Sequence, residues 1–150
     1  MPISQGAMSE AHAGRRYPPT PEYEVTAAKI AEFAVALGEP AADTDAESAG
    51  LVAVAPPTFA AVIAATAWQV MFDDPELGLA LRRIVHGDQR FSFTRPLRAG
   101  DRVRASLVID KVRSRGPADI VTATVEVDAA DGETVCTATA TFFHSHEAAA

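Results

Sequence analysis

The stretch TFAAVIAATAWQVMF, Thr58 to Phe72, decides the fold. It carries no charged residue and directly follows Pro56 and Pro57, which suit the first turn of a helix but not its interior. A membrane-spanning helix needs roughly 20 apolar residues, and this stretch is shorter. Its many alanines add little side-chain bulk, so a sheet can pack closely against it from several sides. We therefore expect a buried central helix and no membrane span.

After this helix the sequence changes to two-residue alternation, which indicates half-buried strands. We predict four strands, over residues 89–95, 102–112, 120–128 and 134–143. One face of the second strand is apolar and consists of Val103, Ala105, Leu107 and Ile109. The opposite face is polar and includes Arg102, Arg104, Ser106 and Asp110. Turn-forming residues between consecutive strands, such as those around Gly116 and Gly132, predict an antiparallel sheet built of hairpins.

A shorter helical pattern precedes the central helix. Thr26 is suited to its N-cap, and Gly38 followed by Pro40 ends it. Its apolar residues fall on one face: Ile30, Phe33, Ala34 and Leu37. The order of helix, uncharged helix and strands predicts an α+β fold, in which a long antiparallel sheet wraps around the central Ala-rich helix.

The composition limits the number of domains and the kinds of partner that we expect. The 150 residues are 48% hydrophobic, enough for one core, and we expect a single domain over 17–144. Residues 1–16 lack an apolar segment, so we expect them to form a disordered arm. We expect residues 145–150 to form a flexible tail. The net charge of −7 disfavours nucleic acid as a partner. The single cysteine, Cys136, cannot form an internal disulfide, which favours a cytoplasmic location.

Three stretches carry a family resemblance: RRYPPTPEYEV, VAPPTF and HGDQRFSFTRPLRAGD, the last running from His86 to Asp101. Together with the order of elements, they resemble the MaoC-like hot-dog dehydratases, in particular the N-terminal, FAS1-like half, over residues 17–143. The chain is similar to the non-catalytic subunit of (3R)-hydroxyacyl-ACP dehydratase. The resemblance implies a single hot-dog fold, an acyl-thioester substrate on ACP or CoA, and elimination or addition of water across its C2–C3 bond. It implies no cofactor and no metal.

The resemblance also implies where catalytic residues would lie. Competent members carry an Asp and a His in a G-D-x-N-P-x-H stretch and a Gly N–H at the start of the central helix. Here Glu39 replaces the Asp, Asp43 is the nearest residue to the His position, and Pro56-Pro57 occupies the helix start. Proline has no N–H to donate. Asp43 or Asp45 is alternatively the cap of a short helix.

Other positions have a functional and a structural interpretation. His86 and its neighbours either face a partner or hold a strand together, with His86 bonded to a backbone carbonyl and Asp88 forming a turn. Trp68 either lines an acyl tunnel or is plain core. The predicted substrate-binding or interface residues are Thr58, Phe59, Trp68, His86, Gly87, Asp88 and Gln89. Several arginines, among them Arg95 and Arg102, either bind phosphates or an acidic carrier protein, or form a solvated sheet face.

Three function classes follow from these observations. The chain is a non-catalytic, substrate-tunnel subunit of a hydroxyacyl-thioester dehydratase or hydratase, working with a partner that carries the Asp and the His. Alternatively, it is a self-sufficient homodimeric hydratase or thioesterase that uses Glu39 and Asp43, or an acyl-thioester binding module without catalysis. We expect a homodimer or a heterodimer with a catalytic MaoC-like subunit, because a hot-dog sheet leaves an exposed strand edge. His144 and His146 lack a third ligand nearby in sequence, so we predict no metal site.

Overall fold

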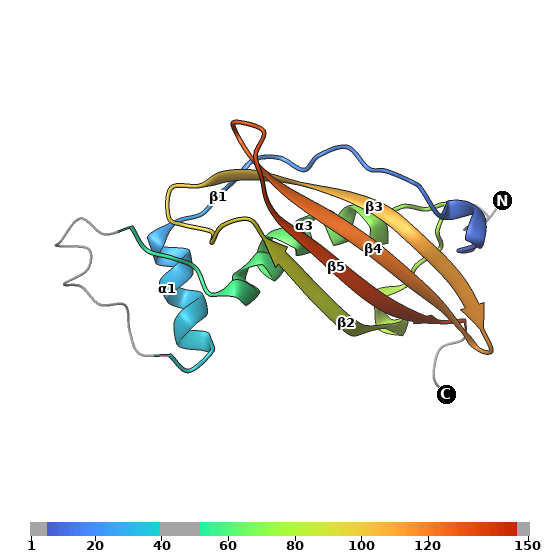
Figure 1. Ribbon diagram of the computed structural model, residues 1–150. Coiled ribbons are helices and arrows are strands. Elements are labelled where there is room, and N and C mark those ends of the chain that lie inside the picture. Colours follow the sequence, from blue (N-terminus) through green and yellow to red (C-terminus); the bar gives the residue numbers. More distant parts are fainter. Residues whose placement is uncertain (1–5, 40–51, 147–150) are drawn as a thin grey trace.

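A five-stranded antiparallel sheet curls around helix α3, Ala60–Phe72 (Figure 1). This computed structural model describes residues 6–39 and 52–146. The strand order in the sheet is β1-β3-β4-β5-β2. The strands are β1 Tyr23–Glu24, β2 Ile84–Phe93, β3 Arg102–Arg115, β4 Ala118–Ala129 and β5 Thr134–Ser145. The predicted α+β architecture, with one helix inside a curved sheet, is therefore confirmed.

The core lies between α3 and the concave face of the sheet. Val103, Ala105, Leu107 and Ile109 of β3 are all buried, as the alternation predicted, while Arg102 and Arg104 are exposed. The helix contributes its own buried face: Ala60, Ile63, Ala64, Ala67, Trp68 and Met71. Three of these six are alanines, which helps a single helix to fit inside the curl of the sheet.

The first helix, α1 (Ala27–Ala36), begins and ends where the sequence indicated. The Thr26 side chain accepts a hydrogen bond from the Lys29 N–H at 3.1 Å, which confirms the N-cap. Gly38 follows the helix with φ of 85°, a left-handed conformation that glycine adopts without steric cost. Helix α3 begins later than predicted, because a 3-10 turn, η2 (Pro57–Phe59), precedes its first α-helical residue.

Strand β2 is longer than predicted, since it begins at Ile84 rather than at residue 89. Its pairing with β5 shifts between His86 and Asp88, so Gly87 forms a β-bulge. Glycine and aspartate are poor strand formers, which is why alternation alone did not extend the strand through them. β2 lies at one edge of the sheet.

Residues 6–16 belong to the segment that was predicted to be a disordered arm, and in the structure they make defined contacts. Met8 is buried, and the 3-10 turn η1 spans Glu10–His12. Residues 14–24, here called the N-terminal strap, run along the outer edge of β3 and end in β1 (Figure 1). Their backbone bonds include the N–H of Gly14 to Ile109 O at 2.6 Å and the N–H of Tyr17 to Leu107 O at 3.0 Å.

Side chains fix the strap beside the end of α3. Asp74 accepts hydrogen bonds from Tyr17 Oη at 2.6 Å and from Arg15 Nη1 at 2.8 Å. Burial opposes ionisation of Asp74, but these bonds hold the pKa of its carboxyl below the usual value. Backbone and side-chain bonds together therefore order a segment whose sequence has no strand periodicity. Within the described residues, no helix has the length and apolar character needed to cross a membrane.

Candidate functional site

A cavity of about 370 Å³ lies at the amino end of α3. Two segments form it: the approach to the helix and the end of β2. The N–H of Ala55 donates to Leu97 O at 2.8 Å, and the N–H of Ala99 donates to Ala53 O at 2.9 Å, so the two segments are joined by their backbones. The lining residues are Ala55, Pro57, Phe93, Thr94, Arg95, Pro96 and Leu97.

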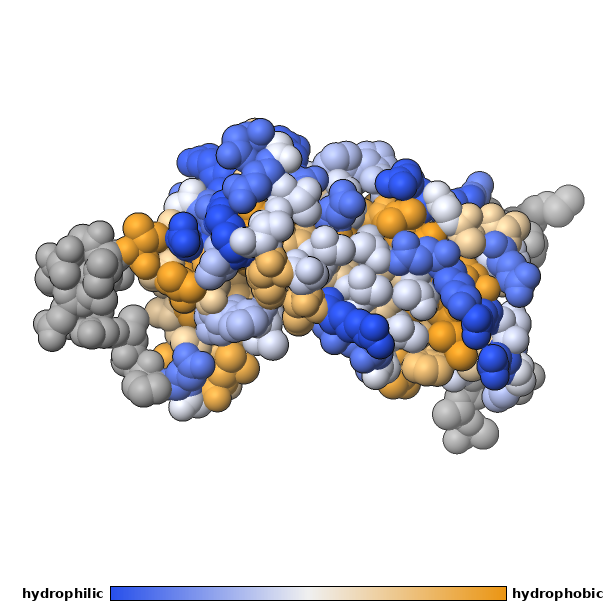
Figure 2. All heavy atoms as spheres, viewed as in Figure 1, coloured by the Kyte–Doolittle hydropathy of each residue, from blue (hydrophilic) through white to orange (hydrophobic). Residues whose placement is uncertain are grey.

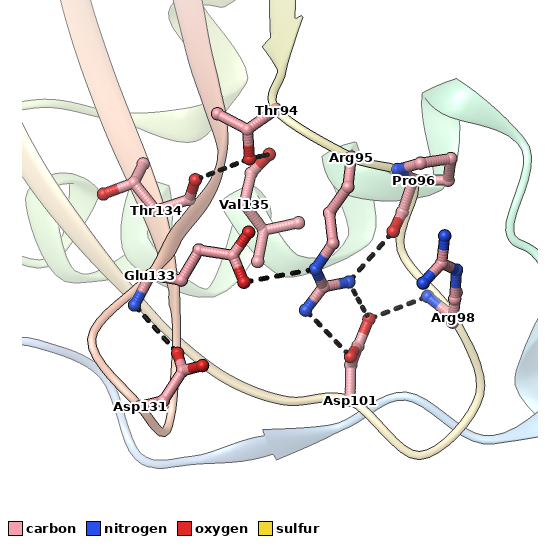
Figure 3. Close-up of polar contacts among 9 residues, drawn as sticks. All are labelled: Thr94, Arg95, Pro96, Arg98, Asp101, Asp131, Glu133, Thr134 and Val135. Carbon is pink, nitrogen blue, oxygen red and sulfur yellow. Dashed lines mark hydrogen bonds and ion pairs between the residues drawn. The ribbon is translucent and has the colours of Figure 1, made fainter.

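A charged cluster, here called the Arg95 clamp, holds one wall of this cavity (Figure 3). The Arg95 guanidinium donates two hydrogen bonds to the Asp101 carboxylate, at 3.0 and 3.1 Å, and a third to Glu133 at 3.3 Å. Asp101 also accepts from the N–H of Arg98 at 2.8 Å, which closes the turn between β2 and β3. Burial raises the pKa of Asp101, but these donors outweigh that effect and lower it overall.

The clamp leaves the cavity without a free acid or base among its described lining residues. Arg95 is the one ionisable side chain there, and it donates four hydrogen bonds, to Asp101, Glu133 and Pro96 O. The Thr94 hydroxyl donates to Thr134 O at 2.9 Å. Pro57 contributes a ring and no N–H. The cavity therefore suits an apolar group better than an anionic one.

The predicted dyad positions do not line this cavity in the described part of the chain. Glu39 is exposed beyond the end of α1, where its N–H donates to Ala34 O at 3.0 Å. Asp43 and Asp45 lie outside the described residues. Of the residues at the helix start, Thr58 is exposed, whereas Phe59 is buried with its ring 5.4 Å from that of Phe33.

His86 and Trp68 lie together near the other end of α3. The His86 ring is 5.1 Å from Trp68 and 4.9 Å from Phe142, and its Nε2 lies 3.0 Å from Gln89 Oε1 rather than from a backbone carbonyl. Trp68 is only 8% exposed and packs in the core. The structure thus separates the predicted site residues into two groups, Thr58 and Phe59 at one end of the helix and the His86 group toward the other.

The bulge residues of β2 have distinct surroundings. A Cβ on Gly87 would overlap Cε2 of Phe143, so only glycine leaves room for that ring where it lies. Asp88 is exposed within the strand rather than in a turn, and its carboxylate lies 3.5 Å from Arg90 Nε.

Several of the remaining charged candidates are bound within the chain. Arg102 pairs with Glu22 at 3.0 Å, and Arg104 donates to Thr20 O at 3.3 Å. His146 Nε2 lies 2.9 Å from Asp119, and buried His144 accepts from the Ala80 N–H at 3.1 Å. The described residues contain no group of three or more His, Cys, Asp or Glu side chains placed to hold a metal ion.

Comparison with known proteins identifies the family. The family model of the FAS1-like dehydratase domain region matches residues 11–138. The chain belongs to this FAS1-like dehydratase family. A UPF0336 protein of Cutibacterium acnes is 45% identical to this family member over 139 residues, which is 93% of this chain and 95% of that protein.

Solved structures support the fold of this chain, a member of the FAS1-like dehydratase family. A chain of the C-terminally truncated HadBC (3R-hydroxyacyl-ACP dehydratase) complex of Mycobacterium tuberculosis is 30% identical, with a TM-score of 0.74 over 88% of this chain and 96% of that one. A MaoC-like dehydratase is 26% identical, with a TM-score of 0.76, covering 91% of this chain and 43% of that one. The predicted MaoC-like resemblance and the single hot-dog fold are confirmed.

Proposed function

We propose that this protein is a non-catalytic, substrate-tunnel subunit of a (3R)-hydroxyacyl-thioester dehydratase or hydratase. The thioester would be carried on ACP or CoA, and a partner subunit would carry the Asp and the His. The main support is the cavity at the amino end of α3, whose described lining holds no uncommitted acid or base. The similarity to a chain of the HadBC complex also favours a partnered subunit.

The chemistry of elimination explains why this lining matters. Removing the C2 proton of a thioester needs a base, the leaving hydroxyl needs an acid, and the enolate-like oxygen needs N–H donors. The helix start here offers Pro56 and Pro57, which cannot donate. A cavity with an apolar lining and a neutralised arginine can still accommodate an acyl chain, so the role that fits is binding rather than proton transfer.

The sheet edges favour one mode of pairing with the partner. The strap covers the outer edge of β3, whereas the outer edge of β2 has no neighbour in the described chain. If β2 of a partner subunit with the same fold pairs antiparallel with β2 of this chain, the end of the partner's strand lies beside the start of this one. In this fold the end of β2 adjoins the cavity, since Phe93 lines it. His86 and Gln89, near the start of β2, would therefore lie beside the active-site loop of the partner, as an interface role requires.

The remaining parts of the proposal are a cytoplasmic location and chemistry without a metal or cofactor. Elimination of water from a hydroxyacyl thioester is acid–base chemistry and does not need a redox group. The single cysteine, Cys136, is buried in the core, and burial raises its pKa to about 11, so it is a poor nucleophile at neutral pH.

Hydration of crotonyl-CoA and of longer trans-2-enoyl thioesters tests the proposal. The assay compares the purified chain alone with the chain co-expressed with a MaoC-like subunit that carries the Asp and the His. Activity only in the mixture, above that of the other subunit alone, is the expected result. Activity of the chain alone that is lost in Glu39→Gln or Asp43→Asn would instead make it a self-sufficient enzyme. Acyl binding without activity in any mixture would make it a binding module.

A further inference from the structure

A row of cations lies on the outer face of the sheet, the face turned away from α3. Lys111, Arg113 and Arg115 are alternate residues of β3, so their side chains share one face, and all three are exposed. None of them is ion-paired with a carboxylate of the described residues, although the whole chain carries a net charge of −7. A concentration of unpaired positive charge in an acidic chain requires an explanation.

An apolar strip continues from the middle of this row. Arg113 pairs with Ile120, Ile120 with Phe143, and Phe143 with Val85, so the four side chains cross four strands on one face. Phe143 is 39% exposed and Val85 is 62% exposed. Gly87 leaves the space that the Phe143 ring occupies on this surface. Figure 2 shows hydrophilic and hydrophobic residues side by side on this face, with the sheet in front of α3.

The nearby described carboxylates form no ion pair with the row. Asp119 is buried and accepts a hydrogen bond from Ser114 Oγ at 2.6 Å, with His146 on the same oxygen. Asp110 accepts a hydrogen bond from the Thr124 hydroxyl, and Asp88 lies beside Arg90. Lys111, Arg113 and Arg115 therefore keep unpaired positive groups at the surface within the described chain.

We propose that the basic row and the apolar strip, together called the outer-face patch, dock the acidic carrier protein that presents the acyl thioester. The proposal rests on the proposed function and chooses ACP over CoA as the carrier. Complementary charge would attract an acidic protein, and the exposed Phe143 and Val85 would pack against an apolar residue on it.

The extent of the patch favours a protein over a small anion. Four residue steps along β3 span about 13 Å, and four adjacent strands span about 14 Å. A single phosphate group needs only one or two of these cations. The apolar strip has no role in binding a phosphate backbone, and the net charge of −7 opposes nucleic acid.

The place of the patch also fits delivery of a substrate. Val85 lies near the start of β2. In the antiparallel pairing proposed above, this end of the sheet lies beside the end of the partner's strand, and hence beside the partner's active-site loop. A carrier docked on the patch of one subunit would thus approach the catalytic residues of the other.

The test compares a carrier-bound and a CoA-bound enoyl thioester of equal chain length, using the complex with the catalytic subunit. The patch variant is Arg113→Glu with Arg115→Glu. The control variant, Arg16→Glu with Lys29→Glu, changes the net charge equally at exposed positions outside the patch. We expect kcat/KM for the ACP thioester to fall about tenfold at low salt in the patch variant, with the CoA thioester and the control variant changed less than about twofold.

Other outcomes separate the two proposals. Equal losses on both thioesters, or no loss on the ACP thioester, would overturn the docking proposal and leave the proposed function in place. A wild-type complex that is inactive on both thioesters would overturn the proposed function itself. RNA binding that is lost in the patch variant, with unchanged ACP kinetics, would assign the patch to nucleic acid. If the double reversal does not fold by circular dichroism, Phe143→Ser and Arg113→Ala, measured separately, must each weaken ACP kinetics.

Discussion

The Arg95 clamp should contribute measurable stability, because its two charges meet in a partly buried place. The side chains of Arg95 and Asp101 are 23% and 17% exposed, and they share two hydrogen bonds. Exposed pairs are worth about 0.2–1 kcal/mol, while breaking a buried pair costs about 3–5 kcal/mol. Solvent screening places this pair between these limits. We expect a coupling free energy of about 2 kcal/mol.

A double-mutant cycle measures this coupling directly. Arg95→Met keeps most of the side-chain length, and Asp101→Asn keeps the size of the carboxyl group, so each change removes charge with little loss of packing. Urea unfolding of the wild type, both single variants and the double variant gives the coupling free energy. Arg98→Met is the matched control, because Arg98 contributes its backbone N–H to the clamp, and it should change stability by less than about 0.5 kcal/mol.

The pH dependence gives a second check on the clamp. The pKa of Asp101 is lower in the folded chain than its ordinary value of 3.8, because Arg95 and the Arg98 N–H outweigh the effect of burial. The coupling should therefore be complete above pH 3.8 and should disappear as the pH falls through the folded-state pKa. A coupling below about 0.5 kcal/mol at pH 7, or one that grows as the pH is lowered, would refute the assignment of the clamp.

Three further predictions concern other parts of the fold, each measured by urea unfolding. Thr26→Ala should lower the free energy of unfolding by about 1 kcal/mol by removing the cap of α1, whereas Thr26→Ser should retain most of it. Met8→Ala should cost about 2 kcal/mol, and no cost would mean that residues 6–16 are not packed as described. Burial lowers the pKa of His144 from 6.5, so the unfolded chain takes up its proton first and wild-type stability falls as the pH drops below 6.5. The His144→Gln variant keeps a hydrogen-bond acceptor for the Ala80 N–H, and its free energy of unfolding should fall less than that of the wild type below pH 6.5.

The sequence predicted the parts of the fold that depend on side-chain periodicity. The uncharged run before Phe72 indicated α3, and alternation along Val103 to Ile109 indicated the buried face of β3. The strap and the start of β2 were not predicted, for two different reasons. The strap is held by backbone bonds and by anchors such as Asp74, which leave no period in the sequence. Gly87 is where β2 bulges, so the pattern is interrupted within the strand itself.

The contacts of the cavity were not predicted from the sequence, and the predicted residues Thr58 and Phe59 are not among those that line it. The start of the central helix was identified from Pro56 and Pro57, and the cavity lies there. The clamp was missed because Arg95 was grouped with surface arginines, while Glu133 reaches it from a hairpin far along the chain. His86 and Thr58 were placed in one set, yet they lie apart, because β2 starts beside Trp68 and ends beside Pro57. Charge pairing across a fold is set by topology, which periodicity does not encode.

The N-terminal strap has a consequence for assembly. A sheet with two open edges can add further chains at both sides without limit and so form fibres. Here the strap forms the β3 side, and three of its residues, Pro18, Pro19 and Pro21, have no N–H for a further strand, so the long open edge of the described sheet is that of β2. Two subunits that join through that edge use up the open edge of each, and growth stops at a closed pair. A short polar segment at the start of the sequence thereby sets an upper limit on the size of the sheet.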